Sequence, residues 1–299
     1  MKKLLLTVLL PALVLLTGCE RDLGVDLPYE GPRLVLFGLL THGEAAEVRV
    51  ARTYPPTGPQ RFDTLTQAEV VLFENDVAVD TLRHQEGGWY RGTRPLRVGA
   101  RYAVRAQLDG FPDAESQPEL MPDPIRITSY DFSEETSPQF GERPAHVLAL
   151  RFQDPPNQEN FYAVAFEQYN AGQQVNTEIF DMNYPFGTPT LCALVESSSG
   201  DFAYRDLCFE NGRGFVDVGI ELGLSELDRT TWEIRRDTVD YVVARLYRIT
   251  EAYYDYLESD YQPEGIEIAF TDAYNPYSNV VGGYGLVVAQ SYDEITATP

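Results

Sequence analysis

The fold of this chain is read most directly from the stretch RYAVRAQLDG, residues 101–110. Apolar and polar side chains alternate along it, which is typical of a β-strand with one buried and one exposed face. The apolar face carries Tyr102, Val104, Ala106 and Leu108, and the polar face carries Arg101, Arg105 and Gln107. Asp109-Gly110 then favours a turn, so we predict a half-buried strand that ends at residue 108.

The chain before this stretch repeats short strands separated by turn residues. Asn75 and Asp76 tolerate turn geometry between two apolar runs, so we predict a β-hairpin there. Several strands at this spacing predict an immunoglobulin-like β-sandwich over residues 34–120. Its other expected strands are Leu34–Leu40 (LVLFGLL), the alternating segment around Val48 and Val50, residues 70–73 and 77–82, and the segment that begins at Trp89-Tyr90 after Gly87-Gly88.

A proline-rich stretch, PELMPDP at residues 118–124, marks the boundary with a second domain. We expect residues 125–299 to form a second β-rich domain, either a sandwich or a barrel-like sheet. Its expected strands lie at residues 148–152, 162–166, 216–222, 239–249 and 286–289. The predicted fold class is therefore mainly β, with one short helix.

That helix is predicted over Thr250–Tyr261. Thr250 is a suitable N-cap, and Glu251 favours the first turn of a helix. Tyr253, Leu257 and Tyr261 recur at helical spacing and form one stripe. We interpret this stripe as core packing rather than as a platform for sugar rings.

The N-terminus, MKKLLLTVLLPALVLLTGCERD, has the features of a lipoprotein signal peptide. Lys2 and Lys3 precede an apolar run that is short for a membrane span, and Leu16-Thr17-Gly18-Cys19 reads as a lipobox. We expect cleavage after residue 18, lipid on Cys19 and a flexible tether over residues 19–33. The alternative is an ordinary secretory signal with an incidental cysteine.

The charge of the chain limits its partners. The formal net charge is −23, and because Lys2 and Lys3 are its only lysines, removal of the signal peptide would bring it to −25. Such an acidic chain repels nucleic acid and anionic lipid headgroups, so neither is an expected partner. The charge is also compatible with simple solubility, or with a surface for a cationic ligand.

Two cysteines, Cys192 and Cys208, remain after Cys19. In an exported protein a disulfide between them is the simplest expectation. A metal site is the competing interpretation, but no histidine is close to either cysteine in the sequence. We therefore expect neither a metal ion nor a cofactor.

Residues 167–213 are rich in Asn, Gln, Gly and Ser, and we expect them to form long loops. Tyrosine among small polar residues is typical of contact surfaces. The candidate partner-contact residues, all expected to be exposed, are Tyr169, Tyr184, Phe186 and Tyr204. The alternative is a tolerated insertion that the disulfide protects from proteolysis.

No catalytic signature is present in the sequence. Gly282, Gly283 and Gly285 lack the Lys-Ser/Thr that completes a phosphate-binding loop, so a bulge or tight turn is the better interpretation. The three histidines are far apart, and no serine-hydrolase, zinc-protease or EF-hand motif occurs. Acidic pairs such as Glu134-Glu135 leave glycosidase chemistry open without indicating it.

Several of these segments, taken in order, resemble one family: the Bacteroidota outer-membrane lipoproteins grouped as the domain-of-unknown-function 4249 family. The segments that match are the lipobox, Leu34–Thr41, Asp154-Pro155 with Asn160-Phe161-Tyr162, the Tyr253–Ser259 helix, and Ser278-Asn279 with Gly282-Gly283 and Gly285. The resemblance implies an outer-membrane lipoprotein, often at the cell surface and often encoded near a TonB-dependent receptor, without an established activity. Glu20 and Asp22 are similar to the acidic surface-export signal of such proteins, although Arg21 interrupts it.

Three classes of function follow as hypotheses. The first is a non-enzymatic surface accessory subunit of a TonB-dependent outer-membrane transporter, which predicts co-purification in detergent. The second is a free-standing ligand- or glycan-binding lipoprotein, which predicts binding through aromatic residues such as Trp89, Tyr184 or Phe186. The third is a hydrolase, which requires a cleft with convergent carboxylates of raised pKa.

Overall fold

The computed structural model of the protein describes residues 29–55, 64–136, 144–175, 179–181, 195–196, 202–206, 209, 212–220, 225–228, 233–236, 238–259 and 277–299. This part of the chain is mainly β, which confirms the predicted fold class. The expected lipidation site Cys19, both cysteines of the expected disulfide (Cys192 and Cys208), and Tyr184 and Phe186 lie outside the described residues. The lipid anchor and the disulfide therefore stay predictions.

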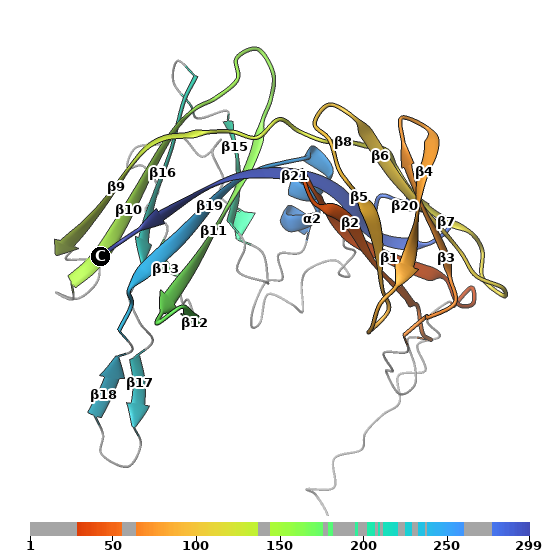
Figure 1. The fold of residues 1–299 in the computed structure, drawn as a ribbon, viewed down its shortest axis with the longest axis horizontal. Helices are drawn as coiled ribbons and strands as arrows, with labels where there is room; N and C mark the ends of the chain where they lie inside the picture. Colours follow the sequence, from red (N-terminus) through yellow and green to blue (C-terminus); the bar gives the residue numbers. More distant parts are fainter. Residues whose placement is uncertain are drawn as a thin grey trace, which may run out of the picture.

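One long sheet of fifteen strands runs through the molecule (Figure 1). Its main path is β14-β15-β11-β19-β21-β1-β2-β5-β4-β3-β6-β7-β20, with β12 added beside β11 and β8 beside β6. The strands before residue 125 are β1 (Leu34–Thr41), β2 (Ala45–Arg52), β3 (Glu69–Glu74), β4 (Val77–His84), β5 (Trp89–Pro95), β6 (Arg101–Gln107), β7 (Ala114–Ser116) and β8 (Glu119–Leu120). The later ones are β11 (Phe161–Asn170), β12 (Gln173–Val175), β14 (Val195–Glu196), β15 (Phe202–Arg205), β19 (Tyr241–Ile249), β20 (Val280–Val281) and β21 (Tyr284–Ala297).

Two smaller sheets complete the β-structure. Four strands in the order β13-β16-β10-β9 form the first of them. They are β9 (Ile127–Thr136), β10 (Pro144–Gln153), β13 (Ile179–Asp181) and β16 (Arg213–Ile220). The second is a hairpin of β17 (Ser225–Asp228) and β18 (Glu233–Arg236), which projects from the left side in Figure 1.

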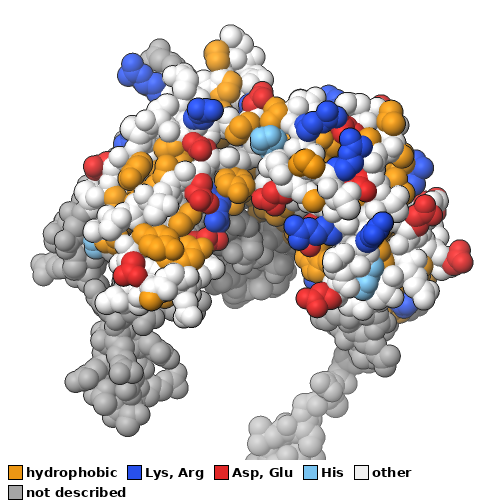
Figure 2. Space-filling view, viewed as in Figure 1, with side chains coloured by type: hydrophobic (Ala, Val, Ile, Leu, Met, Phe, Trp, Pro, Cys, Tyr) orange, Lys and Arg blue, Asp and Glu red, His pale blue; other side chains and the backbone are white. Residues whose placement is uncertain are grey.

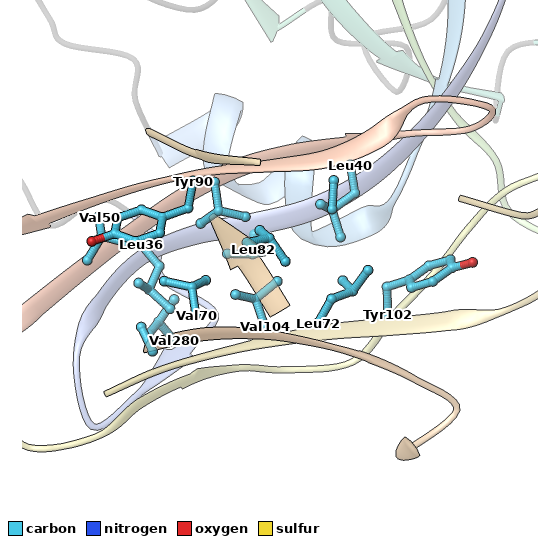
Figure 3. Packing of buried hydrophobic residues seen from close by; sticks show 14 of the residues in the cluster. Leu36, Leu40, Val50, Val70, Leu72, Leu82, Tyr90, Tyr102, Val104 and Val280 are labelled. Carbon is cyan, nitrogen blue, oxygen red and sulfur yellow. The ribbon is translucent and has the colours of Figure 1, made fainter. Parts of the chain in front are cut away.

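The first core lies between β1, β2 and β5 on one side and β3 and β6 on the other (Figure 3). Apolar side chains at alternate positions point into it, such as Leu36, Val50, Leu72 and Val104, each at most 1% exposed. Tyr102, Val104 and Ala106 are all buried, so the alternation predicted for the stretch 101–108 is confirmed for these residues.

The second core lies between β11 and β19 of the long sheet and β10 and β16 of the four-stranded sheet. Leu148 and Leu150 on β10 face Tyr162 and Val164 on β11, and all four are at most 2% exposed. The predicted strands at 148–152 and 162–166 therefore exist and extend further in both directions.

Strand β21 joins the two halves. It pairs in parallel with β1 and antiparallel with β19, so the last strand of the chain lies between the two (Figure 1). Val287 and Ala289 pack into the first core, whereas Ala297 packs into the second. The predicted boundary assigns every residue after 125 to the second domain. The structure corrects this, because β20 and the start of β21 belong to the first core.

Helix α2 (Glu251–Ser259) confirms the predicted helix as far as residue 259, and residues 260 and 261 lie outside the described residues. Tyr253, Tyr254 and Leu257 are buried against Leu286 and Val288 of β21. The interpretation of the aromatic stripe as core packing is therefore confirmed for Tyr253 and Leu257. Within the described residues, no helix is long and apolar enough to cross a membrane.

The glycine cluster is a tight turn that fits against β1. A Cβ on Gly283 would lie 2.4 Å from the Leu34 carbonyl oxygen, and one on Gly285 would lie 1.9 Å from the Leu36 carbonyl oxygen. Gly285 also has a φ of +114°, which side chains rarely permit. The turn interpretation is thus confirmed.

Candidate interaction surface

The two faces of the long sheet have different roles. On β21, the first core contacts Val287 and Ala289, whereas α2 contacts the alternate residues Leu286 and Val288. Because successive side chains on a strand point to opposite faces, α2 covers the face opposite to the cores. We call this the helix face. On either side of α2 it carries a group of partly or fully exposed side chains.

The first group is the tyrosine patch, on β11, β19 and the end of β21. It consists of the tyrosines Tyr169, Tyr241, Tyr247 and Tyr292 together with the charged residues Glu167, Arg245 and Glu294. Its members are directly opposite or diagonal neighbours on paired strands, and such cross-strand neighbours interact through their side chains.

The charges of the tyrosine patch satisfy one another. Arg245 donates to Glu167 at 2.8 Å and to Glu294 at 2.6 Å. The hydrogen bond to Glu167 raises the pKa of Arg245, and the same bond lowers the pKa of Glu167. Both groups thus stay ionised at neutral pH, which suits fixed recognition and not proton transfer.

The tyrosines are arranged in two cross-strand pairs. The rings of Tyr169 and Tyr241 stack with centroids 5.0 Å apart and planes 9° from parallel. The rings of Tyr247 and Tyr292 lie 5.4 Å apart at 50°. The Tyr169 hydroxyl donates to Glu167 at 2.8 Å, and this hydrogen bond raises the pKa of Tyr169. The pairs give the patch a defined geometry with few rotatable bonds, which is favourable for binding.

The second group is the arginine patch, on β1, β2, β4 and β5. It consists of Arg49, Arg83 and Arg91 together with Glu47, Phe37 and Trp89. Phe37 lies opposite Arg49, which in turn lies opposite Trp89, and Arg91 lies between Glu47 and Arg83. All three arginines are exposed. In the view of Figure 2, basic and acidic side chains are interspersed on both halves of the molecule, and more of the basic ones lie on the right.

A buried polar cluster holds the Asp154-Pro155 and Asn160-Phe161-Tyr162 segments. The Tyr162 hydroxyl donates to Asp154, and the Asn160 amide nitrogen Nδ2 donates to Asp206 at 2.8 Å. Arg248 donates to the Asn160 side-chain oxygen. Burial raises the pKa of Asp154, with a further increase from Asp206. These groups bond to one another, so we interpret the cluster as a structural link between β10, β11 and β15.

A second carboxylate with a raised pKa is Glu119, where burial is the main cause. Asn279 donates to it at 3.3 Å, and Asn279 also bonds the backbone of Val287 on β21. Glu119 shares no partner with Asp154 among the contacts of the described residues. Asp255 of α2 is a third carboxylate whose pKa is raised mainly by burial.

The family follows from comparison with known proteins. A sequence model described as "Domain of unknown function (DUF4249)" matches residues 20–296. The chain belongs to this family. No curated protein matches the chain. One similar solved structure is described as a marsupial T cell receptor, with 8% identity over 73% of this chain and 94% of that chain. Its TM-score of 0.22 is too low to support an argument about fold or function.

Two of the four predicted contact residues of this DUF4249 chain can be placed. Tyr169 lies in the tyrosine patch, on strand β11 rather than on a loop. The expected exposure of Tyr204 is wrong: its side chain is buried in the second core beside Tyr162 and Phe209. Tyr204 lies on β15, which pairs with β11, and the composition of the surrounding segment concealed that strand.

The other residues of the tyrosine patch were not predicted. Alternation within residues 239–249 could have shown them, because Val242, Ala244 and Leu246 are buried while Tyr241, Arg245 and Tyr247 lie on the opposite face. Tyr292 and Glu294 lie beyond the predicted end of the last strand, so they carried no such signal. No group of three or more His, Cys, Asp or Glu side chains in the described ranges could hold a metal ion.

Proposed function

We propose that this protein is a lipid-anchored outer-membrane lipoprotein that serves as a surface accessory or binding subunit of a TonB-dependent transporter. The observation that carries the proposal is the tyrosine patch, an ordered aromatic surface whose charges are satisfied within the patch. Tyrosine is enriched at the centres of protein interfaces, where it provides large contact area at small entropic cost.

The proposed anchor has support from the sequence. The family match begins at residue 20, directly after Cys19 of the lipobox. A diacylglyceryl group together with an N-acyl chain provides the multiple chains that stable anchoring needs. If this is right, Cys19→Ser leaves an uncut or soluble protein. Mass spectrometry that finds an unmodified mature N-terminus at another residue would contradict it.

The proposed disulfide between Cys192 and Cys208 orders part of the segment that follows β11. Removing such a bridge typically costs about 2–5 kcal/mol in small exported domains. Alkylation of the native, non-reduced protein should label neither thiol. Quantitative labelling of both under oxidising conditions would show that the bridge does not form.

A binding role, rather than catalysis, is favoured by the ionisable groups on the helix face. General acid–base catalysis needs a pKa close to the working pH, whereas the pKa of Glu167 is lowered and that of Arg245 is raised. Each shift moves the group further from neutral pH. We therefore propose contact as the function of this surface.

Co-purification tests this role. The lipoprotein is solubilised in detergent from cells with its native neighbours, and the captured outer-membrane proteins are quantified by mass spectrometry. We expect a β-barrel transporter to be enriched and to be lost with the double variant Tyr169→Ser, Tyr241→Ser. Tyr130→Ser is the matched control, because Tyr130 is a 47% exposed tyrosine on strand β9 of the other sheet. Unchanged capture by a correctly folded double variant would contradict the proposed contact surface.

The second candidate is a free-standing ligand- or glycan-binding lipoprotein. The observation that favours it is Trp89, which is partly exposed on the helix face beside exposed Arg49, with exposed Phe37 on the other side of Arg49. It predicts that the purified soluble chain binds a glycan without a transporter, with quenching of tryptophan fluorescence. Weaker glycan binding by Trp89→Phe in calorimetry would separate this candidate from the first.

A further inference from the structure

We infer that the arginine patch is a docking site for an acidic, carboxylate-rich segment of a partner protein. This inference rests on the proposed function, because it assumes a protein partner. It adds that the segment of the partner that binds here is acidic. The site is the exposed helix face of β2, β4 and β5, on the opposite side of α2 from the tyrosine patch.

The first observation is that the three arginines have no partner among the residues that the structure describes. Arg49, Arg83 and Arg91 make no ion pair and no side-chain hydrogen bond with the described residues. Other exposed arginines do pair, as Arg97 does with Glu74 and Arg105 with Glu115. Exposed Arg126 and Arg213 are also unpaired among the described residues, so what distinguishes this patch is that its three unpaired arginines lie on neighbouring strands.

The second observation is that two of these positive charges face each other. Arg83 and Arg91 are directly opposite on the antiparallel strands β4 and β5. Like charges at such positions destabilise a sheet. Only Glu47, opposite Arg91, offsets them within the patch, and it makes no ion pair within 4 Å. An incoming carboxylate between the two guanidinium groups would relieve this repulsion.

The third observation is how charge is divided along the sequence. Residues 29–124 contain 10 arginines and 14 acidic residues, a net charge of −4, whereas residues 125–299 contain 10 arginines and 29 acidic residues, a net charge of −19. The arginine patch lies in the nearly balanced half. Beyond a Debye length of about 8 Å the charge of the second half is largely screened, so a docked segment senses mainly the local arginines.

The composition of the patch selects a protein segment as the occupant. Arginine and large aromatic residues are enriched among the residues that dominate protein interfaces, and here Phe37 and Trp89 flank Arg49. The guanidinium group binds carboxylates through two parallel hydrogen bonds. An extended anionic bilayer, in contrast, would also meet the repulsion of a chain with a net charge of −23.

The test uses the purified mature chain and a short fluorescein-labelled poly-glutamate peptide, with poly-glutamine of equal length as the uncharged comparison. Binding is measured by anisotropy and by the fluorescence of the two tryptophans over a series of salt concentrations. We expect binding of poly-glutamate alone, weakened by salt, and about tenfold weaker for Arg49→Gln, Arg83→Gln, Arg91→Gln, since each lost charge-assisted contact reduces affinity.

The matched control removes three exposed arginines outside the patch: Arg94→Gln, Arg126→Gln, Arg213→Gln. It changes the net charge equally and should alter binding less than twofold.

Equal weakening by both triple variants, or no binding of poly-glutamate, would overturn the inference. Patch-dependent binding to phosphatidylglycerol vesicles without peptide binding would assign a lipid instead, and patch-dependent dimers in sedimentation would assign a second copy of the chain. No arm requires the transporter, so failure here is distinguishable from failure of the proposed function.

Discussion

Gly285 determines how closely the last strand can approach β1. At this position a Cβ would lie 1.9 Å from the Leu36 carbonyl oxygen, and the φ of +114° is itself unfavourable for a side chain. We expect Gly285→Ala to lower the free energy of unfolding by about 3 kcal/mol or more, because strain and overlap with fixed backbone add together. Denaturant unfolding followed by circular dichroism measures the loss.

Gly110 provides the control for that prediction. It also has a positive φ, +86°, but a Cβ there would meet no atom within 4 Å. Gly110→Ala should therefore cost only the conformational penalty of about 1–2 kcal/mol. Equal losses for the two variants would show that close packing of Gly285 on β1 is not what the glycine provides.

Glu119 makes stability depend on pH. Burial raises its pKa above the ordinary value of 4.5, so its contribution to stability is complete at low pH and is lost as the pH rises through the raised pKa. Glu119→Gln keeps an acceptor for Asn279 and cannot ionise. We expect the variant to be more stable than the native chain at pH 7 and to have nearly the same stability at pH 3. The midpoints of denaturant unfolding at the two pH values measure this. A difference that is larger at pH 3 would contradict this sign.

The β3–β4 hairpin shows, at the scale of one element, how far turn residues predict structure. Asn75 and Asp76 were expected to form its turn, and they do so with φ values of +51° and +66°. The predicted strand 101–108 and the predicted helix were also correct in type. In each case the signal is local, because alternation, helical spacing and turn residues act over a few neighbouring positions.

For the same hairpin, we predict that glycine has different effects on stability at two adjacent residues. Asp76→Gly should stabilise the chain by about 0.5 kcal/mol, because Asn-Gly is the preferred pair for this turn. Asn75→Gly should not, because the Asn75 side chain accepts a hydrogen bond from the Arg101 amide at 3.0 Å. Thermal unfolding of the two single variants compares them. Stabilisation by both would mean that this hydrogen bond contributes little.

The whole molecule is linked through β21, which supplies residues to both cores. Leu150 is fully buried in the second core, so Leu150→Ala should cost about 2–5 kcal/mol. Because β21 pairs with both β19 and β1, we expect faster amide hydrogen exchange in β1 and β2 as well as in β10 and β11. Val70→Ala in the first core is the reciprocal variant. If the faster amide exchange is confined to the mutated half in both variants, the two halves unfold independently.

This linkage is what the sequence could not predict. The parallel pairing of β1 with β21 joins segments that are far apart in the sequence. Neither segment has a sequence feature that identifies the other as its neighbour. The burial of Tyr204 depends in the same way on pairing with β11. The candidate surfaces have this origin too, since Arg83, Arg91 and Arg49 come together only when β4, β5 and β2 align.

The position of β21 also sets the order of events in synthesis. Strand β1 is among the first described segments to be made, yet its neighbour arrives about 250 residues later, where Arg33 also meets the Gly282 carbonyl. Contacts between such distant segments slow folding. A chain that lacks β21 therefore keeps one edge of β1 open, and a prematurely terminated chain lacks the strand that closes it. Quality-control proteases would find that exposed edge in truncated products and not in complete ones.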